Sequence, residues 1–240
     1  MEADWKERTR MLVGDEGIEK LSRAHVAVFG LGGVGGMAAE LLCRAGIGTL
    51  TIVDGDSYHA SNRNRQIGAL CSTDGKKKAE EMAARLLDIN PDLKLHVHAE
   101  YLKDQPMIDV LSAAKYDYVV DAIDTLSPKI YLLFHAVRLD LQVVSSMGSG
   151  ARFDPLQIKT ADISETHTCT LAFDLRKRLR RLGVTHGITC VFSTEPHQKS
   201  AVVHCEDEKN KKSMIGTISY MPPVFGSVCA SVVIRALLET

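Results

Sequence analysis

Short apolar runs alternate with longer amphipathic segments through the first 150 residues of the chain. Runs of only five or six residues, rich in Val, Ile and Leu, predict strands at 25–29, 49–53, 93–97, 116–121 and 142–146. Segments in which apolar residues recur every three or four positions predict helices at 4–22, 33–45, 75–88, 106–114 and 128–140. Strands that alternate with helices favour right-handed crossovers and a mostly parallel sheet. We therefore expect an α/β fold of the Rossmann-like, doubly wound kind.

The pattern is looser after residue 150, where we expect a C-terminal extension of further strands and helices. Strands are predicted at 157–162 and 189–193, and helices at 169–182 and 222–238. The stretch 195–216 is polar and contains the charged run 206–212, so we expect an exposed, mobile loop there.

The segment 224–238 is the most apolar part of the chain. It is shorter than the roughly 20 residues that a membrane-spanning helix needs, and Gly226, Ser231 and Arg235 interrupt it. We interpret it as a buried helix and expect no membrane contact. The polar start MEADWKERTR does not resemble a signal peptide, and none of the six cysteines forms a C-x-x-C pair. A cytoplasmic protein with reduced thiols is the simplest interpretation.

Four glycines follow the first predicted strand, three of them in the pattern G-x-G-x-x-G, and an acid follows the second strand. The glycines are Gly30, Gly32, Gly33 and Gly35, and the acid is Asp54. Such a turn lets the backbone approach a phosphate, while the helix behind it directs N–H groups and the positive end of its dipole at the anion. The motif predicts a nucleotide site but does not separate NAD from ATP.

Cationic and amide side chains cluster in the segments that follow the second strand. Asn62, Arg65 and Lys78 lie there with Asp56, and Asp124 follows a later strand. In a doubly wound sheet these positions share the carboxyl edge with the glycine turn. Arg and Lys suit phosphate oxygens, and a carboxylate beside them can hold Mg²⁺. This set favours ATP with Mg²⁺ over a nicotinamide cofactor.

Several short motifs also carry a family resemblance. In order along the chain they are GLGGVGG, IVDGD, SNRNRQ, GKKK, INP and DAID. In order and spacing they resemble the ThiF/MoeB adenylating enzymes, the fold family of ubiquitin-activating enzymes. Three motifs of the second half, SMGSGARFDP, VFSTEP and GTISYMPPVFG, resemble the branch of tRNA threonylcarbamoyladenosine dehydratases. The resemblance implies a single adenylating domain over 1–240, with an N-terminal arm (1–22), a nucleotide-binding core (23–150) and a substrate-side extension (151–240).

The resemblance also implies roles for individual residues. Gly30, Gly32, Gly33 and Gly35 would line the ATP phosphates, and Asp54, with Asp56 nearby, would take the ribose hydroxyls. Asn62, Arg65 and Lys78 would contact the phosphates and stabilise charge as the α-phosphorus is attacked. Asp124 would hold Mg²⁺. Arg10, in the motif TRMLVG, would reach into the site of a partner subunit, which implies a homodimer.

The implied reaction is ATP-dependent cyclisation of N6-threonylcarbamoyladenosine in tRNA, through an acyl-adenylate, with loss of water overall. Alternatives remain open at this point. The chain could activate a small ubiquitin-like sulfur-carrier protein, although it lacks the two C-x-x-C zinc pairs of such activators. It could be an NAD-dependent oxidoreductase, or an ATP-binding adaptor without turnover. A sulfur-mobilising protein partner is a further possibility.

One predicted helix, 169–182, is strongly basic on one side. The net charge of the whole chain is −1, so any nucleic-acid site must be a local patch. Leucines at helical spacing (171, 175, 179 and 182) should face the core. The outward positions would then be Arg176, Lys177, Arg178, Arg180 and Arg181, with no acid between them. Such a face is usually only solvated, but here it is a candidate contact for the tRNA backbone.

Overall fold

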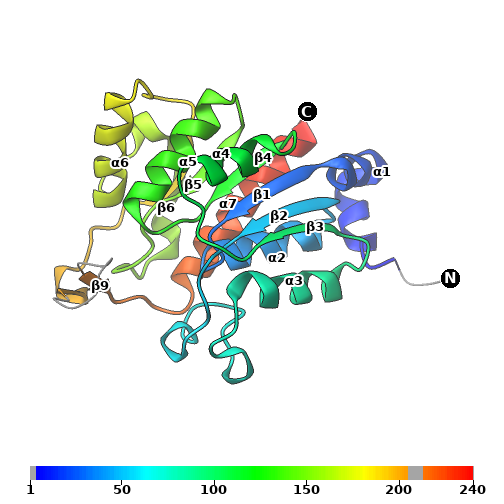
Figure 1. The fold of residues 1–240 in the computed structure, drawn as a ribbon, viewed down its shortest axis with the longest axis horizontal. Helices are drawn as coiled ribbons and strands as arrows, with labels where there is room; N and C mark the ends of the chain where they lie inside the picture. The colour runs from blue at the N-terminus through cyan, green and yellow to red at the C-terminus, as the bar shows by residue number, and fades with distance from the viewer. Residues whose placement is uncertain (1–3, 205–212, 240) are drawn as a thin grey trace.

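Seven strands form one sheet in the structure, a computed structural model that describes residues 4–204 and 213–239. In chain order the strands are β1 His25–Phe29, β2 Thr49–Val53, β3 Lys94–His98, β4 Tyr118–Asp121, β5 Val143–Ser146, β6 Ile158–Asp162 and β7 Thr189–Ser193. Their spatial order is β3-β2-β1-β4-β5-β7-β6, and only β6 runs antiparallel to its neighbour (Figure 1). The chain order reverses between β1 and β4, and at such a switch point a doubly wound fold binds its ligand. The predicted fold class is confirmed.

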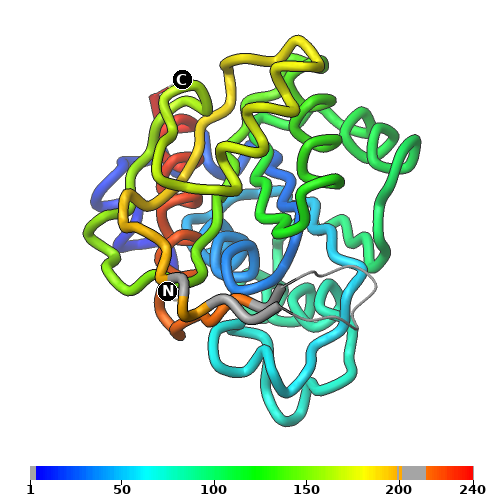
Figure 2. The backbone as a smooth tube through the Cα atoms, turned by 90° about the vertical axis from the view of Figure 1, so that its left-hand side faces the viewer, coloured from blue at the N-terminus to red at the C-terminus, as the bar shows by residue number. Residues whose placement is uncertain are grey.

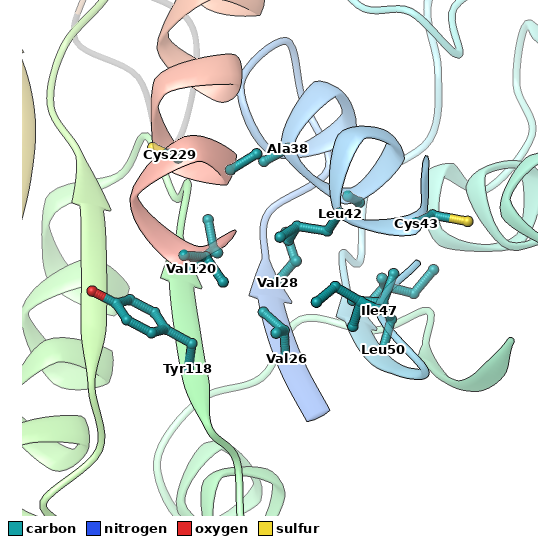
Figure 3. Close-up of a cluster of buried hydrophobic side chains, with 14 of the residues drawn as sticks. Val26, Val28, Ala38, Leu42, Cys43, Ile47, Leu50, Tyr118, Val120 and Cys229 are labelled. Atoms are coloured by element: carbon teal, nitrogen blue, oxygen red, sulfur yellow. The ribbon is translucent and has the colours of Figure 1, made fainter. Parts of the chain in front are cut away.

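Helices cover both faces of this sheet (Figure 1). One face carries α2 Gly35–Ala45, α3 Lys78–Ile89 and α7 Met221–Glu239, with α1 Glu7–Arg23 against α7. The other face carries α4 Gln105–Ser112, α5 Leu126–Arg138 and α6 Thr170–Arg181. Each layer buries its own apolar cluster against the strands. Figure 3 shows part of the first cluster, in which Leu42 of α2 and Cys229 of α7 lie over Val28 and Val120 of the central strands.

The last helix, α7, belongs to this core. By length and composition alone α7 could cross a membrane. Its buried residues, which include Phe225, Cys229 and Val233, instead pack with α2 and the sheet. Figure 2 shows the helix, in red, beside the blue N-terminal helix α1. The predicted buried helix is therefore present, and its packing accounts for its hydrophobicity without a bilayer.

Two segments differ from the sequence-based predictions. Within the predicted loop 195–216, a short 3-10 helix (Lys199–Ala201) is followed by the antiparallel pair β8 Val202–His204 and β9 Ser213–Ile215. Strands of three residues are too short to show a periodic pattern, and the charged run 206–212 lies outside the described residues. Leu182, predicted to face the core, is 49% exposed because α6 ends at Arg181 and the chain turns at Gly183 with a φ of +83°.

Candidate functional site

The glycine turn is fixed by its own backbone at two of its glycines. Gly30 has a φ of +86°, and a Cβ there would lie 2.8 Å from the carbonyl oxygen of Ala122. A Cβ on Gly35 would lie 1.7 Å from the carbonyl oxygen of Gly30. Only glycine fits these positions, because any side chain would push the turn open. The turn therefore needs glycine for its own shape at both ends.

Gly32 is different, because it faces open space. A Cβ there would have one neighbour within 4 Å, the Nε2 atom of Gln66 at 3.8 Å. Helix α2 begins three residues later, at Gly35, so its first N–H groups adjoin this open stretch. An open backbone turn at a helix N-terminus is the usual place for a phosphate group. Gln66 itself is buried, and its Oε1 atom has no hydrogen-bond partner.

Helix α7 supports the turn from behind. A Cβ on Gly33 would lie 2.8 Å from Cβ of Pro222. A Cβ on Gly226 would lie 2.3 Å from the carbonyl oxygen of Val34. Pro222 and Gly226 come from the motif MPPVFG, nearly 190 residues along the chain from the turn. No local pattern in the sequence predicts this contact, through which α7 supports the glycine turn.

Asp54 links the end of β2 to the glycine turn. Its two carboxylate oxygens accept hydrogen bonds from the backbone N–H groups of Leu31, at 2.7 Å, and Asp56, at 2.8 Å. Both bonds orient the carboxylate within the site, and Asp54 remains only partly buried. Its predicted contact with the ribose stays a prediction.

Lys78 and Asp56 form an ion pair at the same edge of the sheet. Lys78 is the first residue of α3 and is only 7% exposed, and its Nζ atom lies 2.6 Å from Oδ2 of Asp56. Burial by itself would raise the pKa of Asp56, but the hydrogen bond and charge of Lys78 outweigh it, so that the pKa lies below its ordinary value. A buried lysine held in this way offers a fixed positive charge to a phosphate.

The loop between β2 and α3 carries the remaining amide and cation. Asn62 is buried, and its Oδ1 atom accepts a hydrogen bond from the N–H of His59 at 3.0 Å. Arg65 donates to the carbonyl oxygen of Ser61 at 2.9 Å and is half-buried. Its own carbonyl oxygen would lie 2.9 Å from a Cβ on Gly33, so the loop borders the turn. These hydrogen bonds order the loop next to the open position.

The phenol of Tyr101, a residue that the sequence did not single out, is influenced by the charges of acids at this edge of the sheet. Burial, followed by the negative charges of Asp56, Asp54 and Asp124, raises the pKa of this phenol. Gly55 lets Tyr101 approach, because a Cβ there would lie 2.4 Å from the backbone nitrogen of Tyr101. The charges of predicted acids from two loops, after β2 and after β4, therefore both act at this edge of the sheet.

The acidic groups fit a magnesium ion that also binds a nucleotide. Among residues 4–204 and 213–239, no cluster of three or more His, Cys, Asp or Glu side chains could hold a metal alone. Mg²⁺ commonly binds to proteins through one or two carboxylates and completes its shell with phosphate oxygens and water. Asp124 is exposed at this edge, so the arrangement suits that mode of binding.

Comparison with known proteins places the chain. A model of the ThiF family matches residues 6–240. The chain belongs to the ThiF family. It is 35% identical to the tRNA threonylcarbamoyladenosine dehydratase of Bacillus subtilis, over 97% of this chain and 94% of that protein. It is 39% identical to the Escherichia coli dehydratase, over 80% of this chain and 75% of that protein. The structure of the E. coli dehydratase TcdA in complex with ATP superposes with a TM-score of 0.88 and 33% identity, covering 100% of this chain and 97% of that one.

Arg10 lies away from the other predicted site residues within the chain. It is on α1, where its guanidinium contacts Asp4, at 3.0 Å, and Asp15. Lys6, at the start of the same arm, packs beside Gly46 at the far end of α2 from the glycine turn. Arg10 therefore cannot complete its own chain's site in this arrangement. Its predicted role in a partner subunit's site stays a prediction.

Most of the basic side chains of α6 point outward. Lys177, Arg178, Arg180 and Arg181 are exposed. Arg176 is half-buried instead, and its guanidinium donates to the backbone carbonyl and the hydroxyl of Thr166. A hollow lies on the outer side of the helix. It is lined by the exposed ring of Phe173 and by Arg176, Lys177, Arg180 and Arg181. A surface of arginines around an aromatic ring is compatible with a nucleic-acid partner.

Proposed function

We propose that this chain carries out the ATP-dependent cyclisation of N6-threonylcarbamoyladenosine in tRNA, with a net loss of water from the modified base. The observation that supports the proposal most strongly is the similarity to a dehydratase of that name along nearly the full length of both proteins. The site agrees with it, because an open glycine turn and the ion pair of the buried Lys78 with Asp56 lie at the carboxyl ends of neighbouring parallel strands.

The first step of the proposed reaction is adenylation. An oxygen of the threonyl carboxylate attacks the α-phosphorus of ATP, and pyrophosphate leaves. The backbone around Gly32 would receive the phosphates, while Lys78, Arg65 and Asn62 would offset the negative charge that gathers during attack. Mg²⁺, when bound, would neutralise phosphate charge, and Asp124 would hold it. Fixed charges that need no rearrangement lower the barrier, since they already point to where charge develops.

The second step closes the ring. A nitrogen of the same threonylcarbamoyl group attacks the activated carbonyl, and AMP leaves with the oxygen that came from the carboxylate. The product is a cyclic hydantoin form of the base. Nucleophile and electrophile belong to one molecule, so the protein needs only to hold them in a reactive conformation. No covalent bond to the protein is required.

The proposal includes partners. The exposed basic face of α6 would contact the tRNA backbone, a role for which Arg178 and Arg181 are well placed. A homodimer would allow Arg10 of one subunit to reach the site of the other. A sulfur-mobilising protein is a further candidate partner. An enzyme that acts on tRNA in this way would work in the cytoplasm.

Mass analysis of the nucleosides tests the proposal. The purified protein is incubated with ATP, Mg²⁺ and tRNA that carries threonylcarbamoyladenosine, and the tRNA is then digested. We expect that nucleoside to lose the mass of one water, with AMP and pyrophosphate as the other products. Lys78→Ala and Arg65→Ala should lose this activity and keep their fold. If the nucleoside is unchanged and the protein instead adenylates a small sulfur-carrier protein, the chain is an activator of such carriers. If the nucleoside is unchanged and the protein binds NAD and not ATP, the chain is an oxidoreductase.

A further inference from the structure

A buried group of polar side chains lies directly beneath the loop that carries Asp124. Lys129 of α5, Asp121 at the end of β4 and Ser145 of β5 are all 0% exposed. The Nζ atom of Lys129 lies 2.7 Å from Oδ2 of Asp121, and the hydroxyl of Ser145 donates to the same oxygen at 2.6 Å. None of these three residues was assigned to the site from the sequence.

This group binds the backbone on both sides of Ile123, the residue before Asp124. The N–H of Ile123 donates to Oδ1 of Asp121 at 3.1 Å. The carbonyl oxygen of Ile123 accepts a hydrogen bond from Nζ of Lys129 at 3.0 Å. Both polar atoms of Ile123, the residue before Asp124, are therefore bound to one buried ion pair.

The same loop also touches the glycine turn. The N–H of Ala122 donates to the carbonyl oxygen of Phe29 at 2.8 Å. The carbonyl oxygen of Ala122 would lie only 2.8 Å from a Cβ on Gly30, which is one reason that this position needs glycine. The distance between Asp124 and the phosphate cradle is thus set by backbone contacts, which the buried pair holds in place.

We infer that Lys129, with Asp121, is a positioning residue that fixes Asp124 for the metal–nucleotide complex. Stability alone is a weak reason for such a pair, because apolar residues of similar volume often stabilise a core as well as a buried ion pair does. Residues that orient a metal ligand typically change metal affinity or activity by about 10- to 100-fold when they are replaced. The inference rests on the proposed role of Asp124 in holding Mg²⁺.

Lys129→Met tests it, because methionine keeps the length of the side chain and removes the donor to Ile123. ATP binding is measured by calorimetry with and without Mg²⁺, and Tm is recorded for each variant. Without Mg²⁺, we expect Lys129→Met to bind ATP as tightly as the wild type. Mg²⁺ should increase the ATP affinity of the wild type, and we expect this increase, the Mg²⁺ gain, to be smaller in Lys129→Met by a factor of about ten or more. Asp124→Asn should lose the same gain. The matched control is Arg85→Met, which breaks another partly buried pair, with Glu40, away from this loop; it should lower Tm and keep the Mg²⁺ gain.

The double variant Asp121→Asn with Lys129→Met serves if the single variant does not fold. It leaves no charge buried without a partner, yet it still lacks the donor to Ile123, so it should also lose the Mg²⁺ gain. A folded variant with the wild-type gain would overturn the inference, as would an intact gain in Asp124→Asn. The proposed reaction can fail separately: wild type that shows the Mg²⁺ gain but forms no cyclic nucleoside would reject the reaction and leave the positioning role standing.

Discussion

Replacement of Gly32 by alanine should separate nucleotide binding from folding. The Cβ would have its nearest neighbour at 3.8 Å, an ordinary contact, and the φ of Gly32 lies outside the left-handed region. A glycine-to-alanine change at such a site stabilises a protein by about 0.4–1 kcal/mol, because alanine lowers the conformational entropy of the unfolded chain. For a chain of this size, this stabilisation corresponds to a Tm that is unchanged or raised by about 1–4 °C.

The same methyl group would occupy space that a phosphate needs. Forcing one methyl group into a well-packed contact costs about 1–3 kcal/mol. Converted at 1.4 kcal/mol for each factor of ten, that is a loss of roughly 5- to 150-fold in ATP affinity. Gly32→Ala should therefore bind ATP more weakly while melting at least as high as the wild type.

Gly35→Ala is the matched contrast within the same turn. Its Cβ would lie 1.7 Å from the carbonyl oxygen of Gly30, so the turn must open before the protein can fold. We expect a cost of about 3 kcal/mol or more, and a Tm lower by about 6–12 °C. Thermal melts and ATP titrations of both variants check the pair. A Gly32→Ala protein with wild-type ATP affinity would show that the open position is not the phosphate cradle.

Three further predictions concern charge. Lys78→Met should reduce product formation by about 100- to 1000-fold, the usual cost of losing one fixed group that stabilises a transition state. Lys78 holds the pKa of Asp56 below its ordinary value of 3.8, so the ion pair stabilises the fold fully above pH 3.8, and this stabilisation is lost as the pH falls through the lowered pKa. The Tm difference between wild type and Lys78→Met should therefore shrink below pH 3.8. A Tm difference that stays constant with pH would contradict the pairing. Arg178→Glu with Arg181→Glu should weaken tRNA binding, make it less dependent on salt, and leave ATP affinity unchanged in filter-binding and calorimetric titrations; unaltered tRNA affinity would remove α6 from the interface.

Local patterns were sufficient for much of the fold. Strands β1, β2 and β7 have the predicted bounds, because a five-residue apolar run between turn residues specifies them. The helix predicted from residue 75 instead begins at Lys78, since Gly75 has a φ of +79° and Lys77 is still extended. The spacing of the glycines and charged residues likewise predicted where the site lies. These residues follow parallel strands, and the carboxyl ends of parallel strands share one edge of the sheet.

Contacts between distant segments were not accessible to the same reasoning. Pro222 and Gly226 look like ordinary helix residues in the sequence, and their role against the glycine turn depends on where α7 packs. In the sequence, Lys129 cannot be told from a solvent-exposed lysine on a helix. The packing of α5 against the sheet is what buries it. Arg176 shares the helical spacing of its basic neighbours but turns towards Thr166, because a backbone carbonyl lies within reach there.

The central claim is that this chain transfers AMP to the carboxylate of the tRNA modification. Its most direct test uses tRNA whose threonylcarbamoyl carboxylate is labelled with ¹⁸O, incubated with the protein, ATP and Mg²⁺. Attack at the α-phosphorus followed by ring closure must leave one labelled oxygen in AMP and none in pyrophosphate, in amounts equal to the cyclic nucleoside formed. Cyclic product with unlabelled AMP, or label in pyrophosphate or inorganic phosphate, would contradict adenylation of the carboxylate.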